Sequence, residues 1–222
     1  MAGVFCTRDF TEATAGEPRA VFERVRRLVP EGNIYFLTQV HADHIVVAEE
    51  VMPEDMPEAD GIISKNPEDI LSILTADCLP ILAWSDQPPL IAAIHAGWRG
   101  LSQRIIGKGM GMLQSLGASH IHVSIGPAIG PCCYAVKGDV TEALHNPPVR
   151  QADGRHYLDL WDTALRQLME SGIQRHLIQC LRICTACHRE LFFSYRRDGE
   201  VTGRNISAIG GKACLLPGLR AG

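Results

Sequence analysis

The chain has 222 residues, a formal net charge of −4, 46% hydrophobic residues and 21% charged residues. This composition excludes an intrinsically disordered chain, because such chains combine few apolar residues with high net charge. The slight acidic excess argues against a dedicated nucleic-acid-binding protein, which usually carries a basic surface. No stretch approaches the roughly 20 consecutive apolar residues that a membrane helix needs. We therefore expect neither nucleic acid nor a membrane as a partner.

The first eight residues contain no basic segment followed by an apolar block, so the sequence predicts no secretory signal and a cytoplasmic location. Thiols stay reduced in that compartment, and the 8 cysteines are expected to serve in the core, in metal binding or in catalysis. No repeat or long linker divides the chain, which predicts a single domain over residues 1–222. The Gly-rich range 210–222 is expected to form a flexible tail.

The hydrophobic pattern predicts a helix over residues 18–29, followed by strands at 34–40 and 44–49. Further apolar runs of strand length follow at 70–75, 79–84 and 90–94.

Residues 101–116 predict a second helix despite three glycines, and 121–125 predicts a strand. A third helix is predicted over 160–169, with Asp159 as its N-cap and Gly172 as its stop signal. Strands are then predicted at 176–183 and 192–195. Because strands and helices interleave without a regular alternation, the order favours a mixed-sheet α+β domain over a doubly wound parallel fold.

Three segments place reactive side chains at the ends of predicted strands, and they contribute His41, Cys78 and His95. Two imidazoles and one thiolate suit zinc, and three protein ligands leave a position for water or substrate. A core cysteine with two hydrogen-bonded histidines is the structural alternative. A second alternative pairs Cys78 as nucleophile with His95 as base, and Asp77 could orient either arrangement. The residues alone do not separate these interpretations.

Arginines supply a candidate anion site. Arg196, Arg197 and Arg204 surround a predicted turn, and Arg99 follows the His95 strand. Guanidinium groups match the oxygens of phosphate or carboxylate. A solvated hairpin with an ion pair to Asp198 is the alternative.

The range 126–134 is rich in glycine and proline, and it could present backbone N–H groups to a substrate or form a plain structural turn. The adjacent Cys132 and Cys133 look too crowded to chelate one metal, so we interpret them as structural. The range 184–188 fits the CxxCH pattern of c-type haem attachment. Haem attachment normally requires export, so we do not predict haem.

Taken together, these segments resemble the YfiH-like family, also called the laccase-domain or multicopper polyphenol oxidoreductase family. TADCLP and HAGWRG are highly specific in combination, and the matches run in family order from about residue 34 to residue 209. The matching segments are QVH (39–41), ADGIIS (59–64), ILTADCLPIL (73–82), AAIHAGWRGL (92–101), GPAIGPCCY (126–134), LDLW (158–161), LFFSYRRDG (191–199) and TGR (202–204).

The resemblance implies an α+β fold of α/β/β/α layers with mixed sheets, similar to the catalytic domain of cytotoxic necrotizing factor. It implies a zinc-dependent purine nucleoside phosphorylase with adenosine deaminase activity, acting on purine nucleosides and inorganic phosphate as a monomer or homodimer. Zinc would be bound by His41, Cys78 and His95, with copper a less favoured metal. Asp77 is our candidate for proton transfer beside these three residues. The phosphate-binding candidates are Arg99, Arg196, Arg197 and Arg204.

Two departures from the family pattern bear on activity. Residues 1–30 are shortened and divergent: Thr7-Arg8 fits the usual N-terminal loop, but Asp9-Phe10-Thr11 follows in place of its remainder. The usual acidic residue after Cys-Tyr is Ala135 here. Three alternatives therefore stay open: a Cys–His hydrolase or amidase that edits peptidoglycan precursors, a copper-dependent polyphenol oxidase, and a non-catalytic purine-binding module.

Overall fold

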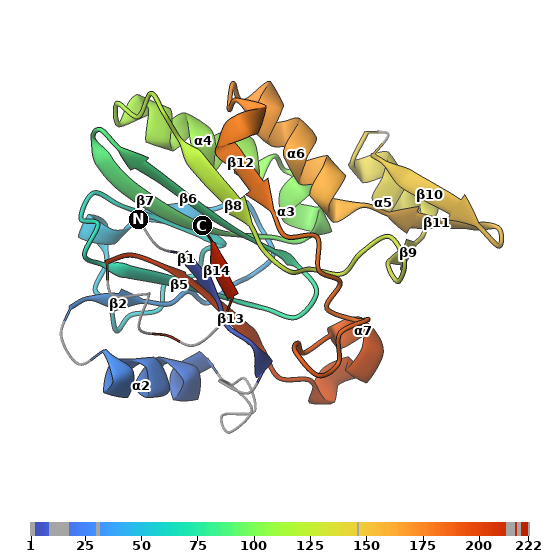
Figure 1. The fold of residues 1–222 in the computed structure, drawn as a ribbon, viewed down its shortest axis with the longest axis horizontal. Helices are drawn as coiled ribbons and strands as arrows, with labels where there is room; N and C mark the ends of the chain where they lie inside the picture. Colours follow the sequence, from blue (N-terminus) through green and yellow to red (C-terminus); the bar gives the residue numbers. More distant parts are fainter. Residues whose placement is uncertain are drawn as a thin grey trace.

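The computed structural model describes residues 3–8, 18–29, 32–145, 147–211, 216 and 219–221. Two mixed β-sheets lie face to face, and helices cover the outer face of each sheet (Figure 1). This arrangement confirms the expected α+β class and its α/β/β/α layers. Asp9, Phe10 and Thr11, where the N-terminus departs from the family pattern, lie outside the described residues.

The first sheet has the strand order β14-β1-β13-β5-β2. Strand β2 pairs with β5 in parallel, and the other neighbours are antiparallel. Helix α2 (Pro18–Leu28) covers its outer face (Figure 1). The strands are β1 (Gly3–Phe5), β2 (Ile34–Tyr35), β5 (Ile70–Thr75), β13 (Asn205–Ile209) and β14 (Leu219–Ala221).

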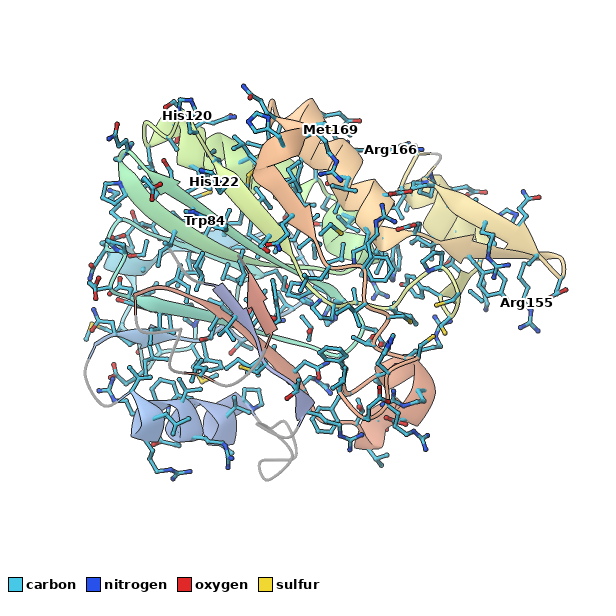
Figure 2. All side chains as sticks on the ribbon, in the orientation of Figure 1. Trp84, His120, His122, Arg155, Arg166 and Met169 are labelled. Carbon is cyan, nitrogen blue, oxygen red and sulfur yellow. The ribbon has the colours of Figure 1, made fainter. Side chains whose placement is uncertain are left out.

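The second sheet has the order β12-β8-β6-β7-β4-β3, with parallel pairs at its two edges and antiparallel pairs between them. Its helices are α3 (Trp98–Ser102), α4 (Ile105–Ser115) and α6 (Leu160–Glu170). The strands are β3 (Ile45–Val47), β4 (Gly61–Ser64), β6 (Leu79–Asp86), β7 (Pro89–Ala96), β8 (His122–Ile125) and β12 (Ile178–Cys180). Cross-strand partners Trp84 and His122 stack with ring centroids 5.3 Å apart (Figure 2).

The four layers enclose three apolar cores. One lies between α2 and the first sheet, one between the sheets, and one between the second sheet and its helices. Strand β6 serves two of them, because alternate side chains point to opposite faces of a sheet. Ile81 and Ala83 pack toward the helices, whereas Leu82 packs toward the first sheet.

A three-stranded sheet projects beside the layers, with Arg155 at its far end (Figures 1 and 2). It contains β9 (Ala135–Val136), β10 (Val149–Ala152) and β11 (Arg155–Leu158), and α5 (Gly138–Ala143) lies against it. The remaining elements are α7 (Tyr195–Asp198) and the 3-10 turns η2 (Ala48–Glu50), η3 (Arg175–Leu177) and η4 (Gly199–Val201).

Several predicted boundaries are wrong. The predicted helix over 101–116 is two helices, because Arg104 adopts a left-handed φ of 64° between α3 and α4. The predicted strands at 34–40, 44–49 and 176–183 are shorter, as β2, β3 and β12. Residues 192–195 form no strand, and the chain turns into α7 instead.

The range expected to be a flexible tail contains β14, which pairs with β1, and the buried Leu216. Residues 212–215, 217, 218 and 222 lie outside the described part of the chain. Among the described residues, none of the helices has the length and apolar character needed to cross a membrane.

Candidate metal centre and cleft

The candidate centre lies where the chain passes between the two sheets. The segment after β2 leaves the first sheet and carries His41 before reaching β3 in the second. The segment after β5 makes the same crossing and carries Cys78 immediately before β6. His95 lies near the end of β7, paired with Pro80 on β6. Residues that are far apart in sequence therefore meet at one rim of the sheet sandwich.

The structure brings His41, Cys78 and His95 together, with their ligand atoms all within 4.8 Å of one another. The two imidazole rings are nearly perpendicular, with centroids 4.8 Å apart. His95 is buried, Cys78 is half-buried and His41 is exposed, so the cluster faces outward on one side. Two imidazole nitrogens and a thiolate at these separations fit a transition metal such as zinc, with room for a further ligand.

Asp60 is the functional residue that the sequence analysis did not single out. It is fully buried immediately before β4, and its Oδ1 lies 2.7 Å from His95 Nδ1. It also accepts backbone N–H bonds from Val40, His41 and Ala42. Its carboxylate thus orients the His95 ring and holds the backbone of the His41 segment. A carboxylate on the remote ring nitrogen is the usual arrangement behind a metal-binding imidazole. The ADGIIS motif contains Asp60, so this motif was the sequence signal that could have identified the residue.

Burial and mutual charge interactions shift the pKa values of the groups at this centre. Burial opposes ionisation of Cys78, but the imidazoles of His95 and His41 outweigh burial and lower the thiol pKa to about 6. Burial would also lower the pKa of His95, yet the Cys78 thiolate and Asp60 raise it to about 9. Burial raises the pKa of Asp60, but its bonds to His95 and the Ala42 N–H lower it overall. Asp60 therefore stays ionised.

The backbone around the centre is strained and closely packed. His41 and Asp77 have left-handed φ values of 60° and 92°, which are uncommon for residues with a side chain and often occur at functional sites. Gly97 follows β7, and a Cβ there would lie 3.0 Å from Cys78 Sγ and 3.4 Å from His41 Cδ2. A side chain at Gly97 would occupy the space between the two ligand-bearing segments.

A cleft of about 700 Å³ opens above the centre. His41, Asp77, Cys78 and His95 all line it. Its other polar lining residues are Thr38, Gln39, Arg99, Glu200, Thr202, Arg196 and Arg204, and its apolar and aromatic ones include Leu37, Leu74, Trp98, Ile129, Tyr134, Leu160 and Tyr195. The cleft therefore combines cations, flat aromatic surfaces and the candidate metal ligands.

Asp77 lines this cleft, but both of its oxygens already have partners. Thr185 Oγ1 donates to Oδ1 at 2.6 Å, and the Arg196 backbone N–H donates to Oδ2 at 2.6 Å. Asp77 therefore connects the Cys78 segment to the start of α7 and to the loop around Thr185.

The structure brings three of the four candidate arginines to the cleft. Arg99 stacks on Trp98 at 4.7 Å, and Arg196 lies 5.0 Å from the Tyr134 ring centroid while donating to Ala135 O at 2.9 Å. Arg204 also lines the cleft and donates to the carbonyls of Thr202 and Gly203.

Arg197 is not brought to the cleft. Its guanidinium donates to Asp198 and to the carbonyls of Thr185, Ala186 and Phe192. Its role in the described structure is therefore to hold neighbouring loops together.

Two other cleft residues have chemistry that the sequence analysis did not assign. Burial raises the pKa of Tyr134 to about 12, so its hydroxyl remains a neutral donor. The buried Thr202 hydroxyl has no hydrogen-bond partner among the described residues. No spacing rule distinguishes these side chains from ordinary loop residues.

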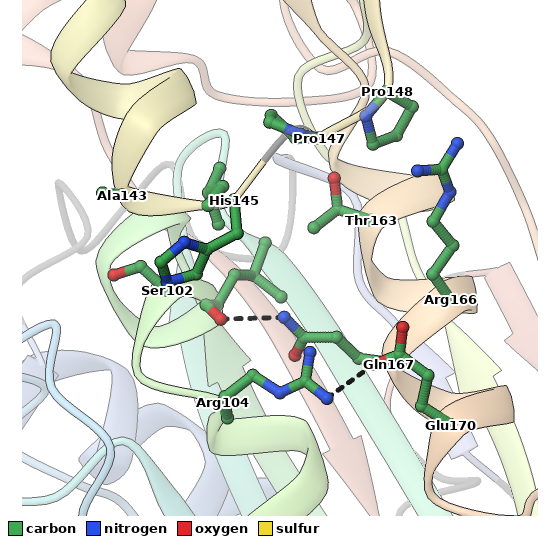
Figure 3. Close-up of a pocket in the computed structure, with 12 residues that line it drawn as sticks. Ser102, Arg104, Ala143, His145, Pro147, Pro148, Thr163, Arg166, Gln167 and Glu170 are labelled. Atoms are coloured by element: carbon green, nitrogen blue, oxygen red, sulfur yellow. Dashed lines mark hydrogen bonds and ion pairs between the residues drawn. The ribbon is translucent and has the colours of Figure 1, made fainter.

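A second pocket, of about 260 Å³, lies between the α3–α4 turn, α6 and the segment after α5 (Figure 3). Arg104 pairs with Glu170 there, and Gln167 Nε2 donates to Leu101 O at 2.8 Å. None of the site residues predicted from the sequence lines this pocket.

A second group of metal-binding type lies outside the cleft. The thiols of Cys132, Cys133, Cys184 and Cys187 have their sulfur atoms all within 4.8 Å of one another. From the sequence, Cys132 and Cys133 are interpreted as structural, because an adjacent pair is expected to be too crowded to chelate one metal easily. In the structure both sulfur atoms lie 3.5 Å from Cys187 Sγ, a spacing that could hold a metal ion.

Comparison with known proteins gives a consistent result. The family described as multi-copper polyphenol oxidoreductase laccase matches residues 2–212. A protein from Geobacillus stearothermophilus named purine nucleoside phosphorylase YlmD is 36% identical over 166 residues, 70% of this chain and 61% of the relative. The chain thus spans about three fifths of that relative's length. The Escherichia coli K12 protein named purine nucleoside phosphorylase YfiH is 32% identical over 86% of this chain and 81% of its own.

The crystal structure of YlmD from Geobacillus stearothermophilus superposes with a TM-score of 0.77 at 32% identity, covering 87% of this chain and 81% of that chain. The layered fold described above is therefore shared with a solved structure.

Proposed function

Because the chain belongs to the multi-copper polyphenol oxidoreductase laccase family, we propose that it is a zinc-dependent purine nucleoside phosphorylase that also deaminates adenosine. It would act on purine nucleosides and inorganic phosphate, releasing a free base and ribose 1-phosphate. The observation that carries the proposal is the convergence of His41, Cys78 and His95 in a cleft that three arginines also line. The names of the relatives from Geobacillus and Escherichia coli support the same activity.

His41, Cys78 and His95 would hold the metal, while Asp60 would orient the His95 ring and hold the His41 backbone. A bound zinc ion would supply a Lewis acid that polarises an oxygen of substrate or water. The candidate ligand set of two imidazoles and one thiolate suits zinc, whereas multicopper dioxygen chemistry needs several histidine-rich sites. Among the described residues, the clusters of metal-binding type contain only these two histidines.

Phosphate would bind Arg99, Arg196 and Arg204, whose guanidinium groups match its oxygens. The purine would stack on the aromatic surfaces of the same cleft, and Thr202 would donate a hydrogen bond to a polar group of the substrate. Stacking accepts any purine, so these contacts explain a broad nucleoside class better than a single substrate.

Asp77 would hold the site in position. This role replaces the proton transfer that its place in the sequence suggested. Its oxygens accept bonds from Thr185 and from the Arg196 backbone, so it holds the wall that carries Arg196. Tyr134 would serve in the cleft as a neutral hydrogen-bond donor, because burial raises its pKa to about 12.

Product analysis by liquid chromatography tests the proposal. Protein with quantified zinc is given adenosine with and without phosphate. We expect adenine only with phosphate and inosine without it. His41→Ala, Cys78→Ala and His95→Ala should lose both products, whereas the exposed His120→Ala should keep both. No product from zinc-loaded protein with any purine nucleoside would overturn the assignment.

The arginines have their own test within the same assay. Arg99→Ala and Arg196→Ala should each raise the KM for phosphate on the order of tenfold or more, because a hydrogen bond to a charged group contributes about 1.5–3 kcal/mol. Inosine formation without phosphate should change little. Arg155→Ala, at the far end of the projecting sheet, is the matched control and should leave both reactions unchanged (Figure 2).

One observation favours a second candidate, a Cys–His hydrolase or amidase. Cys78 is paired with His95, and His95 Nδ1 bonds to Asp60, which is the order of a nucleophile, a base and an orienting carboxylate. This candidate requires a free thiolate. It therefore predicts alkylation of Cys78 without any chelator and activity that does not depend on metal, whereas the phosphorylase proposal predicts that zinc protects Cys78.

A further inference from the structure

Two loops that are distant in sequence bring four cysteines together next to residues that line the cleft. Cys132 and Cys133 end the Gly/Pro-rich range 126–134, and Cys184 and Cys187 follow β12. Cys187 Sγ lies 3.5 Å from both Cys132 Sγ and Cys133 Sγ, and all four sulfur atoms lie within 4.8 Å of one another. Four zinc-bound sulfur atoms at about 2.3 Å from a tetrahedral centre would be separated by roughly 3.8 Å. The observed spacing needs only small side-chain adjustments to reach that value.

We propose that Cys132, Cys133, Cys184 and Cys187 bind a second zinc ion in a closed, structural site that is separate from the cleft centre. Four thiolates complete the tetrahedral shell and leave no position for substrate, which distinguishes this site from the three-ligand centre at His41. The soft sulfur donors select zinc over the hard cations magnesium and calcium.

Burial and hydrogen bonding also fit metal ligation better than hydrophobic packing. Cys132 and Cys187 are exposed, whereas free cysteines that serve only packing are among the most buried residues. The buried Cys184 sulfur accepts a backbone N–H bond from Gly130 at 3.3 Å. Such a bond stabilises a thiolate and orients its sulfur, as hydrogen bonds to metal ligands do.

The surrounding backbone is built for this close approach. A Cβ at Gly130 would lie 2.9 Å from the Trp161 ring and 3.2 Å from Cys132 Sγ, so this position needs glycine. Ala128 forms a bridge with Cys184, and the Thr185 backbone N–H donates to Ala128 O at 3.0 Å. Backbone contacts thus align the two cysteine-bearing loops.

The second site would stabilise one wall of the cleft. Ile129 and Tyr134 line the cleft and flank the first cysteine pair in sequence. Thr185, between the second pair, bonds to Asp77, the neighbour of Cys78. A zinc ion linking the two loops would therefore hold Tyr134 and Asp77 in fixed positions without contacting substrate.

Metal stoichiometry tests the proposal. Elemental analysis of the wild-type protein should find two zinc ions per chain. The double variant Cys132→Ser/Cys187→Ser should retain one, and His41→Ala/Cys78→Ala should also retain one. Cys180→Ser is the matched control, because Cys180 lies outside both clusters, and it should retain two.

Cobalt substitution identifies the ligands without relying on activity. Co²⁺ bound to four thiolates absorbs with stronger sulfur charge-transfer bands than Co²⁺ bound to two imidazoles and one thiolate. The His41→Ala/Cys78→Ala variant should therefore show the four-thiolate spectrum alone. Cys187→His should still bind cobalt with a shifted spectrum, since three cysteines and one histidine also form structural sites.

Three results would overturn the proposal. One is a single zinc ion in the wild-type protein that disappears in His41→Ala/Cys78→Ala. Another is an unchanged cobalt spectrum in Cys132→Ser/Cys187→Ser. The third is a disulfide among the four cysteines in protein purified with reductant, detected by alkylation and peptide mass spectrometry. Should the double serine variant fail to fold, the cobalt spectrum of Cys187→His decides between the outcomes.

Discussion

At the scale of single residues, the geometry of the cleft centre depends on neighbours that are not themselves candidate ligands. Asp60 orients His95 and accepts the His41 backbone N–H, and Gly97 leaves space for the Cys78 sulfur. TADCLP and HAGWRG contain two of the three candidate ligands, Cys78 and His95. The function of Asp60 and Gly97 becomes apparent only when the strands that carry them are placed side by side.

Gly97→Ala should weaken zinc binding at the cleft centre by roughly 1 to 3 kcal/mol, because the new Cβ would lie 3.0 Å from Cys78 Sγ. The measurement is the zinc concentration that protects Cys78 from alkylation, read from the Cys78 peptide by mass spectrometry. Gly111→Ala is the matched control, since a Cβ there meets nothing within 4 Å. The control should leave protection unchanged and stabilise helix α4 by about 0.5–1 kcal/mol. Equal protection in Gly97→Ala and the wild type would contradict the packing argument.

Asp60→Asn should reduce zinc affinity at the same centre by roughly 10- to 100-fold, because the carboxylate that orients His95 would be lost. The same protection assay at Cys78 measures the change without interference from the four-cysteine cluster. Asp86→Asn, at the exposed end of β6, should behave like the wild type. An unaltered protection curve in Asp60→Asn would show that His95 needs no orienting partner.

At the scale of elements, the segment 191–204 shows how tertiary contacts override a strand-like pattern. Phe192 and Phe193 are buried, and this apolar run predicts a strand. Instead, Ser194 caps α7 by accepting the Arg197 backbone N–H, and Asn205 bonds both backbone groups of Phe193. These side-chain bonds take the places that a neighbouring strand would have filled, so the chain turns and presents Arg196 to the cleft.

Asp198 at the end of α7 makes the stability of the protein depend on pH. Hydrogen bonds from Arg197 lower the pKa of Asp198 below its ordinary 3.8. Because the folded pKa is the lower one, this pair stabilises the protein above pH 3.8, and the contribution is lost as the pH falls through the folded pKa. Asp198→Asn should therefore lower the free energy of unfolding at neutral pH, by at most about 1 kcal/mol for a partly screened pair.

Urea unfolding at neutral pH and at decreasing pH values measures this effect. The stability difference between the wild type and Asp198→Asn should shrink as Asp198 becomes protonated. Asp153→Asn, an exposed carboxylate at the hairpin between β10 and β11, is the control and should track the wild type at every pH. A stability difference that grows as the pH falls would contradict the expected stabilisation by ionised Asp198.

At the scale of the whole molecule, the cleft exists because two sheets are held together by the core between them. The ligand-bearing segments link one sheet to the other, so their separation depends on how those sheets pack. Leu82 and Ile91 from the second sheet meet Leu71 and Ile73 from the first in that core. Loosening this core should therefore affect stability and the metal centre together.

Leu82→Ala should lower the free energy of unfolding by about 2–5 kcal/mol, because a fully buried leucine leaves a cavity in a core that relaxes only partly. Leu28→Ala is the matched control, since Leu28 ends α2 with 47% of its surface exposed, and it should change stability by less than about 0.5 kcal/mol. Denaturant unfolding of both variants measures the difference. Similar values for the two variants would contradict the assignment of Leu82 to the core between the sheets.

Elements and residues with local signals can be predicted from the sequence. Helices α2 and α6 follow from apolar periodicity and from the Asp159 cap, and β5 follows from a mainly apolar run of strand length. The specific motifs around Cys78 and His95 placed the chain in its family. These features depend on side chains within a few residues of one another, so they can be read along the chain.

The contacts between residues that are distant in sequence become visible in the folded structure. It joined Cys132 and Cys133 to Cys184 and Cys187, placed Asp60 behind His95, and turned Arg197 away from the cleft while Arg196 lines it. It also shortened strands and broke the predicted 101–116 helix at Arg104. The physical reason is that these outcomes follow from sheet order and from loop crossings between layers. Local propensity carries no information about partners that lie tens of residues away.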